Sequence, residues 1–570
     1  MKRNLIIACL FFTTSLFAQK KAPDNWQTLD SKTDNVYGVG AEDAYKTLGA
    51  KSSKTVIVAV IDGGVDVNHE DLKSVIWTNP GEIPDNGIDD DKNGYVDDVH
   101  GWSFLGGKNG DIGVESTELA RLVYKGNIKY ASADSSKMTE AEAKEYKEYK
   151  KMKKAFQDEQ KILENRIQRM NMLISYIDNV KEQNNGALTK DAFEKYIPEN
   201  EAEKSVAKRL KKVISSKEFK PEEFEDIINK QKEKFEENFR INLANTDSIR
   251  QYIVGDDISN PNERFYGNNH IQGPDASHGT HVSGIIAAMR DNNLGIKGIA
   301  NNVKIMVIRA VPDGDERDKD VANGIRYAVD NGASVINMSF GKYYSPDKNV
   351  IDDAVKYAES RDVLLVHAAG NESKDNDVEL SFPNREYLSG GVATNWIQVG
   401  ASGYKNGKNI IGSFSNYGQK KVDLFAPGVD VYSCIPDNKY ENMSGTSMAS
   451  PSTAGVAALI REYFPGLKAP EVRAVLMKTV TTTSNKVDVP GLYKKKAFGK
   501  NKTKPVQKKV SEICIAGGFV NANNAVKELM GQNNENRNPF SLKKNNSSIL
   551  IIINTINQPT ISDYWADLKH

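Results

Sequence analysis

Apolar runs alternate with amphipathic stretches along most of the chain. Residues 56–61 are all apolar and stop at Asp62, which two glycines follow. Such a run is typical of a strand buried on both faces of a parallel sheet. Similar apolar runs recur at residues 303–311, 332–341, 361–371 and 396–402. Because helical stretches such as residues 320–331 separate these runs, the pattern predicts an α/β fold with a doubly wound, mainly parallel sheet.

The pattern changes between residues 112 and 250, which are rich in Lys, Glu, Gln and Asn and have helical periodicity. Thr139 and Glu142 fit a capping box, and the apolar positions after them recur at spacings of three, four and seven. This stripe contains Tyr149, Met152, Phe156, Leu163, Ile167, Met170, Ile174 and Ile177. A second stripe follows Pro221. We therefore expect two antiparallel helices, with a shorter helix at residues 189–197 between them, inserted into the α/β domain.

The two ends of the chain differ from the rest. The N-terminus has a basic start, an apolar stretch from Leu5 to Phe17 and a small residue at Ala18, which is typical of a secretory signal peptide. The stretch is shorter than the roughly 20 residues of a membrane-spanning helix. We expect an exported protein, secreted or periplasmic, without a membrane span. The expected divisions are a signal peptide at 1–18, an α/β domain in two parts at 19–111 and 251–530, the helical insertion at 112–250 and a polar tail at 531–570.

Composition narrows the classes of partner. The formal net charge is zero, which gives no reason to expect a nucleic acid partner. The sequence has no CxxC, HExxH or Cys/His cluster, so a transition-metal enzyme is not expected. Outside the signal peptide only Cys434 and Cys514 remain. An exported protein could join them in a disulfide, or both could be buried thiols, and their spacing does not decide between these alternatives.

Four polar residues stand where expected strands and helices meet. Asp62 ends one apolar run and Asn371 follows another, so both belong at the edge of the sheet where α/β proteins place their sites. His278 precedes an apolar helical run. Ser447 precedes a helix rich in small residues, with Pro451 expected in that helix's first turn. The start of this helix supplies backbone N–H donors for negative charge, and the Asn371 carboxamide is a natural partner for a developing oxyanion.

The motifs around these residues resemble those of a known family. In chain order they read VIDGGVD, HGTHVSG, AAGN and GTSMASP, which are similar to the motifs of the subtilisin-like serine peptidases (subtilases, peptidase family S8). The order Asp, His, Ser separates them from the α/β-hydrolases, which run Ser, acid, His and use GxSxG. Further matches at NMSFG, APGVDVYS and GFVNANNAV extend the resemblance over about residues 51–110 and 256–530.

The resemblance implies a secreted serine endopeptidase that acts on proteins or peptides and needs no cofactor for catalysis. Ser447 would be the nucleophile, His278 its general base, and Asp62 the group that orients the base. Asn371 and the Ser447 N–H would form the oxyanion hole. The residues implied in substrate binding are Ser339, Phe340 and Gly341, as an edge that pairs with the substrate strand, and Ala369 and Gly370, as a wall of the pocket for the residue before the cut. We expect His281 to be structural, whereas His367 could belong to the core or to the pocket.

A structural calcium ion is also expected. Residues 85–102 place Asp89, Asp91, Asn93, Asp97 and Asp98 around Gly94. Oxygen donors that alternate before a glycine resemble the first half of an EF-hand loop. The closing Glu is absent, since its position holds His100, so the loop is not an EF-hand, and the alternative is a solvated acidic turn. By resemblance, Asp71 and Asn292 match a second calcium site of subtilases.

Alternatives to this interpretation remain open. A pseudoenzyme would keep the fold without activity, but none of the three reactive residues is altered. An esterase or a peptide ligase would use the same acyl-enzyme and would differ in its products. The helical insertion is either a surface appendage or a lid that selects substrates, since it is rooted between two of the triad residues. We expect the protein to act as a monomer.

Overall fold

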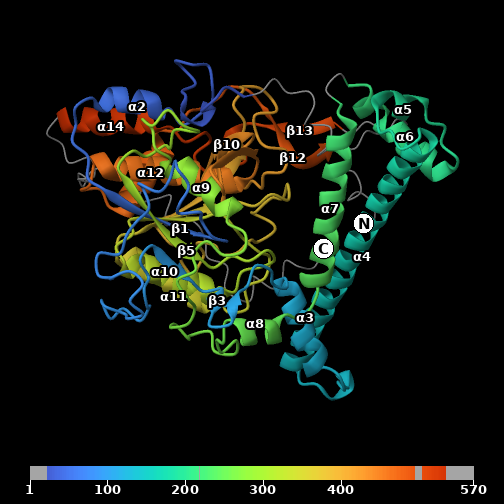
Figure 1. Cartoon of the computed structure of the whole chain (residues 1–570). Coiled ribbons are helices and arrows are strands. Elements are labelled where there is room, and N and C mark those ends of the chain that lie inside the picture. Colours follow the sequence, from blue (N-terminus) through green and yellow to red (C-terminus); the bar gives the residue numbers. More distant parts are fainter. Residues whose placement is uncertain (1–21, 217–218, 495–503, 535–570) are drawn as a thin grey trace.

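A seven-stranded sheet forms the centre of the structure (Figure 1). The computed structural model describes residues 22–216, 219–494 and 504–534. The strands lie in the order β2-β5-β1-β6-β7-β8-β9, and every neighbouring pair is parallel. Their bounds are β1 (Val56–Asp62), β2 (Gly101–Ser103), β5 (Val303–Arg309), β6 (Val335–Met338), β7 (Leu364–Ala368), β8 (Trp396–Ser402) and β9 (Leu424–Pro427). The predicted α/β fold with a doubly wound, mainly parallel sheet is confirmed.

Helices cover both faces of this sheet (Figure 1). Alternate residues of β1 point to opposite faces, so Val58 and Val60 belong to one core and Ala59 and Ile61 to another. The first core is shared with α2 (Ala41–Leu48), α9 (Ser277–Ala287), α12 (Thr446–Tyr463), α13 (Ala469–Lys478) and α14 (Ala522–Asn534), and the second with α10 (Asp318–Asp330) and α11 (Lys348–Ser360). Burial on both faces explains the continuous apolar sequence of the strands.

Short elements complete the sheet domain. Three antiparallel pairs are β3 (Gly106–Gly107) with β4 (Gly110–Asp111), β10 (Val431–Ile435) with β11 (Lys439–Met443), and β12 (Val487–Lys494) with β13 (Lys504–Lys508). Its 3-10 helices are η2 (Trp26–Thr28) and η4 (Val510–Glu512), whereas η3 (Ser135–Lys137) lies in the helical insertion.

The helical insertion lies between β4 and α9 and projects from one side of the sheet domain (Figure 1). Its helices are α3 (Glu118–Lys129), α4 (Glu140–Gln183), α5 (Lys190–Lys195), α6 (Glu201–Ile214), α7 (Pro221–Ile241) and α8 (Asp247–Ile253). The long helix α4 begins at the predicted capping box, in which the Glu142 N–H donates to the Thr139 side chain and the Thr139 N–H donates to the Glu142 carboxylate. As expected, α4 and α7 lie side by side and run in opposite directions.

The apolar stripe of α4 serves two separate cores. Nearer the sheet, Phe156 packs with α3 and with Leu243, whereas Tyr176 and Ile177 pack with α5, α6 and α7 at the far end. The prediction of two long helices and one shorter helix was therefore incomplete. It missed α3 and α8, which flank the long helices, and α6, whose buried residues, among them Leu210, are few in a highly charged sequence.

Cys434 and Cys514 are both free and fully buried, so the alternative of two buried thiols holds.

Among the described residues, none of the helices combines the length and the apolar character of a membrane span. The expected signal peptide at residues 1–18 and most of the expected tail lie outside the described residues, although α14 continues to Asn534.

Candidate active site

Asp62 and His278 meet at the carboxyl end of the sheet. Asp62 is the last residue of β1, and His278 lies in the first turn of α9, 216 positions later in the chain. The His278 Nδ1 lies 2.8 Å from Asp62 Oδ1 and 3.0 Å from Oδ2. The carboxylate is 3% exposed and also accepts a hydrogen bond from the Gly63 N–H at 2.8 Å. Because an ionised carboxylate only accepts, Nδ1 carries the proton, and in the neutral form of the ring Nε2 is the acceptor.

Ser447 is the second residue of α12. Its Oγ donates to the Ser339 carbonyl oxygen at 3.1 Å, and the Ser339 Oγ donates to the Ser447 carbonyl oxygen at 2.9 Å. The second bond has a cause in the sequence, since Pro451 lacks the N–H that would bond to the carbonyl four residues earlier. The expectation that Pro451 lies in the first turn was wrong. Because α12 begins at Thr446, before the serine, the proline lies in the second turn.

Asn371 reaches the same place from the loop after β7. Its Oδ1 accepts hydrogen bonds from the Thr446 N–H at 2.8 Å and the Thr446 hydroxyl at 3.0 Å. Because both Thr446 groups are donors, the Oδ1 end of the carboxamide faces α12. The Nδ2 amide can therefore donate to another group. Gly370 has a φ of 106°, and a Cβ there would lie 2.3 Å from Asn416 Nδ2, so this turn requires glycine. The Ala369 carbonyl accepts from the same Asn416 amide at 3.0 Å.

The residues predicted to bind the substrate strand follow β6 directly. Ser339, Phe340 and Gly341 lie between this strand and an antiparallel bridge of Lys342 with Phe382. The Lys342 N–H donates to the Phe382 carbonyl at 2.9 Å, and the Phe382 N–H donates to the Lys342 carbonyl at 2.8 Å. A Cβ on Gly341 would lie 3.1 Å from the Phe382 carbonyl oxygen. The segment is thus fixed by β6 at one end and by this bridge at the other.

His367 belongs to the core under this segment. It is 1% exposed, and its ring centroid lies 6.1 Å from that of Phe340 and 5.3 Å from that of Trp396. Its Nδ1 lies 3.1 Å from Gln398 Oε1. Burial lowers the pKa of His367 to about 4, so the ring is neutral at pH 7. Of the two alternatives that the sequence left open, the structure favours the core.

His281 lies one turn after His278 on α9 and is fully buried. Its Nε2 lies 3.1 Å from the carbonyl oxygens of both Val431 and Glu441. Burial lowers the pKa of His281 to about 4. It packs under the helix, as the sequence predicts for a structural histidine.

The acidic loop at residues 85–102 brings part of its predicted calcium ligands together. Asp91 and Asp98 share two amide donors. Asn79 Nδ2 donates to Asp91 at 3.0 Å and to Asp98 at 2.8 Å. Asn93 Nδ2 donates to Asp91 at 3.1 Å and to Asp98 at 3.0 Å. Glu82 joins them, and one carboxylate oxygen from each of the three acids lies within 4.8 Å of the others. The sequence pattern missed Glu82 because it precedes the alternating part of the loop.

The other two predicted carboxylates of the loop bind backbone instead. Asp89 accepts hydrogen bonds from the N–H groups of Asn93 and Gly94, at 3.0 and 2.8 Å. Asp97 accepts hydrogen bonds from the N–H groups of Asn86 and Gly87, at 3.1 and 2.8 Å. Both acids therefore shape the loop around the cluster of Glu82, Asp91 and Asp98.

Asp98 indicates that this cluster suits a hard cation. It is fully buried, and burial raises its pKa to about 6, although the Tyr327 hydroxyl donates to it at 2.5 Å. A divalent cation that takes carboxylate oxygens as ligands would offset this desolvation. The donor set of Glu82, Asp91 and Asp98 fits calcium.

Asp71 and Asn292, the residues of the second expected calcium site, are in direct contact. The Asn292 Nδ2 donates to Asp71 Oδ1 at 2.7 Å, and the Ile296 N–H donates to Oδ2 at 3.3 Å. Asp71 is fully buried, and burial raises its pKa. Asn292 presents its amide nitrogen rather than its oxygen to the carboxylate.

The chain is similar in sequence to proteins of one known family. A model of the subtilase family matches residues 53–505. The thermophilic serine proteinase of Bacillus sp. (strain AK1) is 40% identical over 218 residues, which are 38% of this chain and 49% of that protein. Subtilisin BL of Lederbergia lenta is 36% identical over 207 residues, which are 36% of this chain and 70% of that protein.

A cold-adapted subtilisin-like serine proteinase of known crystal structure is 31% identical, with a TM-score of 0.33, and the match covers 38% of this chain and 73% of that one. The chain spans about half the length of the Bacillus sp. (strain AK1) relative, 49%. The family model nevertheless extends over residues 53–505, which is most of the sequence. The protein belongs to the subtilase family.

Proposed function

We propose that the protein is an exported serine endopeptidase that hydrolyses peptide bonds through Asp62, His278 and Ser447. The observation that carries this proposal is the 2.8 Å contact between the Asp62 carboxylate and His278 Nδ1. It holds the ring in the tautomer whose Nε2 is basic, as a general base for a serine requires. Export rests on the signal-like sequence of residues 1–18.

The reaction would proceed through an acyl-enzyme. The Ser447 hydroxyl donates to Ser339 in this structure, and the reaction requires it to donate to His278 Nε2 instead. As Oγ attacks the substrate carbonyl carbon, His278 Nε2 takes its proton, and Asp62 stabilises the imidazolium. His278 then gives that proton to the leaving amine, and the C–N bond breaks. Water hydrolyses the ester by the same steps, with His278 again as base and then acid.

The tetrahedral intermediate carries a negative charge that needs donors. The Ser447 N–H lies in the first turn of α12, where helix geometry leaves backbone donors without an intrahelical acceptor. Asn371 contributes its Nδ2 amide, since its oxygen is used by Thr446. Together these two donors would form the oxyanion hole.

Exchanging Asn371 for Asp separates the two roles of this side chain, which are to accept hydrogen bonds from Thr446 and to donate one to the oxyanion. The Asn371→Asp variant keeps an oxygen for Thr446 but loses the donor, whereas Asn371→Ala loses both. Removing the corresponding donor from subtilisin itself lowers kcat by about 10²–10³-fold, and we expect both variants to lose at least that much with little change in KM. Only Asn371→Ala should also lower the melting temperature. Steady-state kinetics with a peptide substrate and thermal unfolding measure the two effects, and wild-type kcat in Asn371→Asp would exclude this oxyanion hole.

The substrates would be proteins and peptides in extended conformation. Ser339, Phe340 and Gly341 would pair with the substrate backbone as an added strand, and Ala369 with Gly370 would line the pocket for the residue before the cut. We propose that the protein acts as a monomer, without a cofactor in the chemical steps.

We propose that calcium stabilises the fold through the acidic loop. Glu82, Asp91 and Asp98 would hold the ion, with Asp89 and Asp97 shaping the loop around it. A weaker second site at Asp71 and Asn292 would require the Asn292 amide to turn its oxygen toward the ion, since its nitrogen now donates to Asp71. A ligand that binds only the folded state at about 100 times its Kd stabilises it by ~2.7 kcal/mol.

Chelation is therefore expected to lower the melting temperature by about 5 °C, by the usual relation for large domains. Calcium should restore it. The matched variant Asp98→Asn should have lost this response, while Asp257→Asn, in an exposed loop elsewhere, should retain it. An unchanged melting temperature of the wild-type protein in chelator would mean that the loop is a solvated turn.

A further inference from the structure

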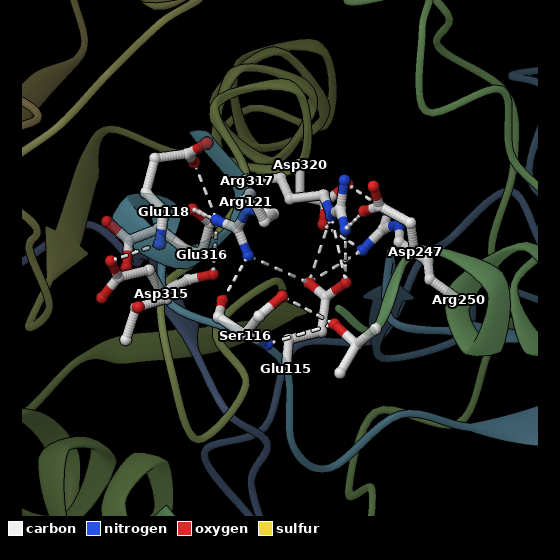
Figure 2. A network of polar contacts seen from close by, with 12 residues as sticks. Glu115, Ser116, Glu118, Arg121, Asp247, Arg250, Asp315, Glu316, Arg317 and Asp320 are labelled. Carbon is white, nitrogen blue, oxygen red and sulfur yellow. Dashed lines mark hydrogen bonds and ion pairs between the residues drawn. The ribbon is translucent and has the colours of Figure 1, made fainter. Parts of the chain in front are cut away.

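Both ends of the helical insertion are held to the start of α10 by a buried network of ion pairs (Figure 2). Arg317, directly before α10, binds Glu115 from the segment that enters the insertion at 2.9 Å and Asp247 from the segment that leaves it at 2.7 Å. Arg250 of α8 binds Asp320 of α10 at 2.8 Å. The side chains of Glu115, Arg250 and Asp320 are fully buried, so these pairs form part of the interior.

The same network reaches Lys342, the residue after the predicted substrate edge of Ser339, Phe340 and Gly341. The Lys342 Nζ lies 2.9 Å from Glu118 in the first helix of the insertion, 2.9 Å from Asp318 in α10, and 2.7 Å from the Glu316 carbonyl oxygen. Lys342 is 3% exposed. Burial alone would raise the pKa of Glu118, but Lys342 and Arg121 lower it well below its usual range, so the carboxylate is charged.

An apolar contact joins the same two parts of the chain. Tyr344, two residues after Lys342, packs against a cluster that contains Leu119 of α3, Phe156 of α4 and Leu243. The insertion therefore contacts the segment after the substrate edge twice, once through an ion pair and once through its own core. On its other side, the Lys342 backbone pairs with Phe382.

We infer that Lys342 is a positioning residue through which the insertion sets the geometry of the substrate edge. The inference rests on the proposed function. A buried charge that loses its partner is strongly unfavourable, so the ammonium keeps its backbone in one place relative to α3 and α10. Since Gly341 and Lys342 are consecutive, the position of Lys342 determines where the edge ends. The insertion thus supports binding of the residues that precede the cut and is more than a surface appendage.

Lys319 provides a matched control for Lys342. Its Nζ lies 2.6 Å from Asp256, 2.9 Å from Glu263 and 2.8 Å from the Asp257 carbonyl oxygen, and it is 5% exposed. It is thus a buried lysine of the same network with two carboxylates and one carbonyl as partners. It lies on α10, away from the substrate edge in sequence.

The experiment compares two substrates in Lys342→Met, Lys319→Met and the wild-type full chain. One is a tetrapeptide amide, whose residues before the cut pair with the edge, and the other is an ester of a single blocked amino acid. We expect the ratio of kcat/KM for the peptide to that for the ester to fall about tenfold in Lys342→Met, less than the hundredfold that a ~1 Å misplacement can cost. The fall should come from KM, and the ratio should stay at its wild-type value in Lys319→Met.

Glu118→Gln tests whether the insertion itself contributes to the position of Lys342, because Glu118 is the insertion's ion-pair partner of this lysine. It leaves Asp318 as a partner for Lys342, so we expect a smaller fall of about threefold, because the buried ammonium keeps one of its two carboxylates. It also keeps the inference testable if Lys342→Met does not fold. Active-site titration with a serine-directed phosphonate is done first. If the wild-type protein does not react, the proposed function is wrong. If the variants react but keep the wild-type ratio of kcat/KM for the peptide to that for the ester, only the inference about Lys342 is wrong.

Discussion

Ser447→Ala is expected to abolish peptide hydrolysis while the protein keeps its fold. Loss of the catalytic serine costs subtilisin itself about 10⁶-fold in kcat, and we expect a loss of the same order because no other group would form the acyl-enzyme. The fold should persist, since within the described part of the chain the Ser447 Oγ makes one hydrogen bond, to the Ser339 carbonyl oxygen. The measurement is cleavage of casein and of a peptide substrate, with thermal unfolding of the same preparations.

Ser444→Ala is the matched control for this substitution. Ser444 lies three residues before the proposed nucleophile, and its hydroxyl accepts from the Asp430 N–H at 2.8 Å. Its removal should change the activity by no more than about twofold, as for an ordinary exposed hydrogen bond. Wild-type cleavage of casein by Ser447→Ala would contradict the assignment of the nucleophile.

Asp62→Asn is expected to lower kcat by about 10⁴-fold, which is the order found when the triad aspartate is removed from subtilisin itself. The carboxylate faces His278 Nδ1 with both oxygens, and a neutral amide cannot stabilise the imidazolium that forms during attack. The Gly63 N–H binds Oδ1, so the new amide nitrogen should replace Oδ2, 3.0 Å from Nδ1. Two donors would then face each other.

Asp66→Asn controls for a general effect of losing a buried acid. The Asp66 carboxylate accepts from the N–H groups of Asn68 and Asp437 and lies four residues after Asp62. We expect its kcat to stay within about threefold of the wild type, since it has no part in the proton transfers. Steady-state kinetics on both variants measure the difference. A loss below tenfold in Asp62→Asn would show that Asp62 does not orient the base.

The sheet and the position of the site could be predicted because their signals are local. Each central strand is a continuous apolar run, and Asp62 ends one of them, so its place at the carboxyl end of the sheet followed from the sequence. His278 likewise stood at the start of an apolar helical run, where α9 begins. Short-range periodicity was enough to place both residues.

The sequence predicts a later start for α12 than the structure has, because Pro451 indicates a first turn. Proline is favoured there, but it is tolerated later if another group satisfies the carbonyl that it leaves without a donor. Here Ser339, more than a hundred residues earlier, donates to the Ser447 carbonyl. No pattern near Pro451 contains that information.

The ion-pair network between the insertion and α10 was not predicted either. Glu115, Arg250 and Arg317 belong to segments far apart in the chain, and each reads as an ordinary charged surface residue. Burial of a charge depends on which partners the fold brings to it, and that is a property of tertiary structure. The sequence predicts an insertion at residues 112–250, but not what its ends contact.

The most direct test of the central claim is to label the folded protein with a serine-directed phosphonate and to map the modified residue by mass spectrometry. If Asp62, His278 and Ser447 form a working triad, one equivalent is incorporated, it resides on Ser447, and His278→Ala is not labelled. The absence of labelling in folded wild-type protein, or a label on any residue other than Ser447, would contradict the account.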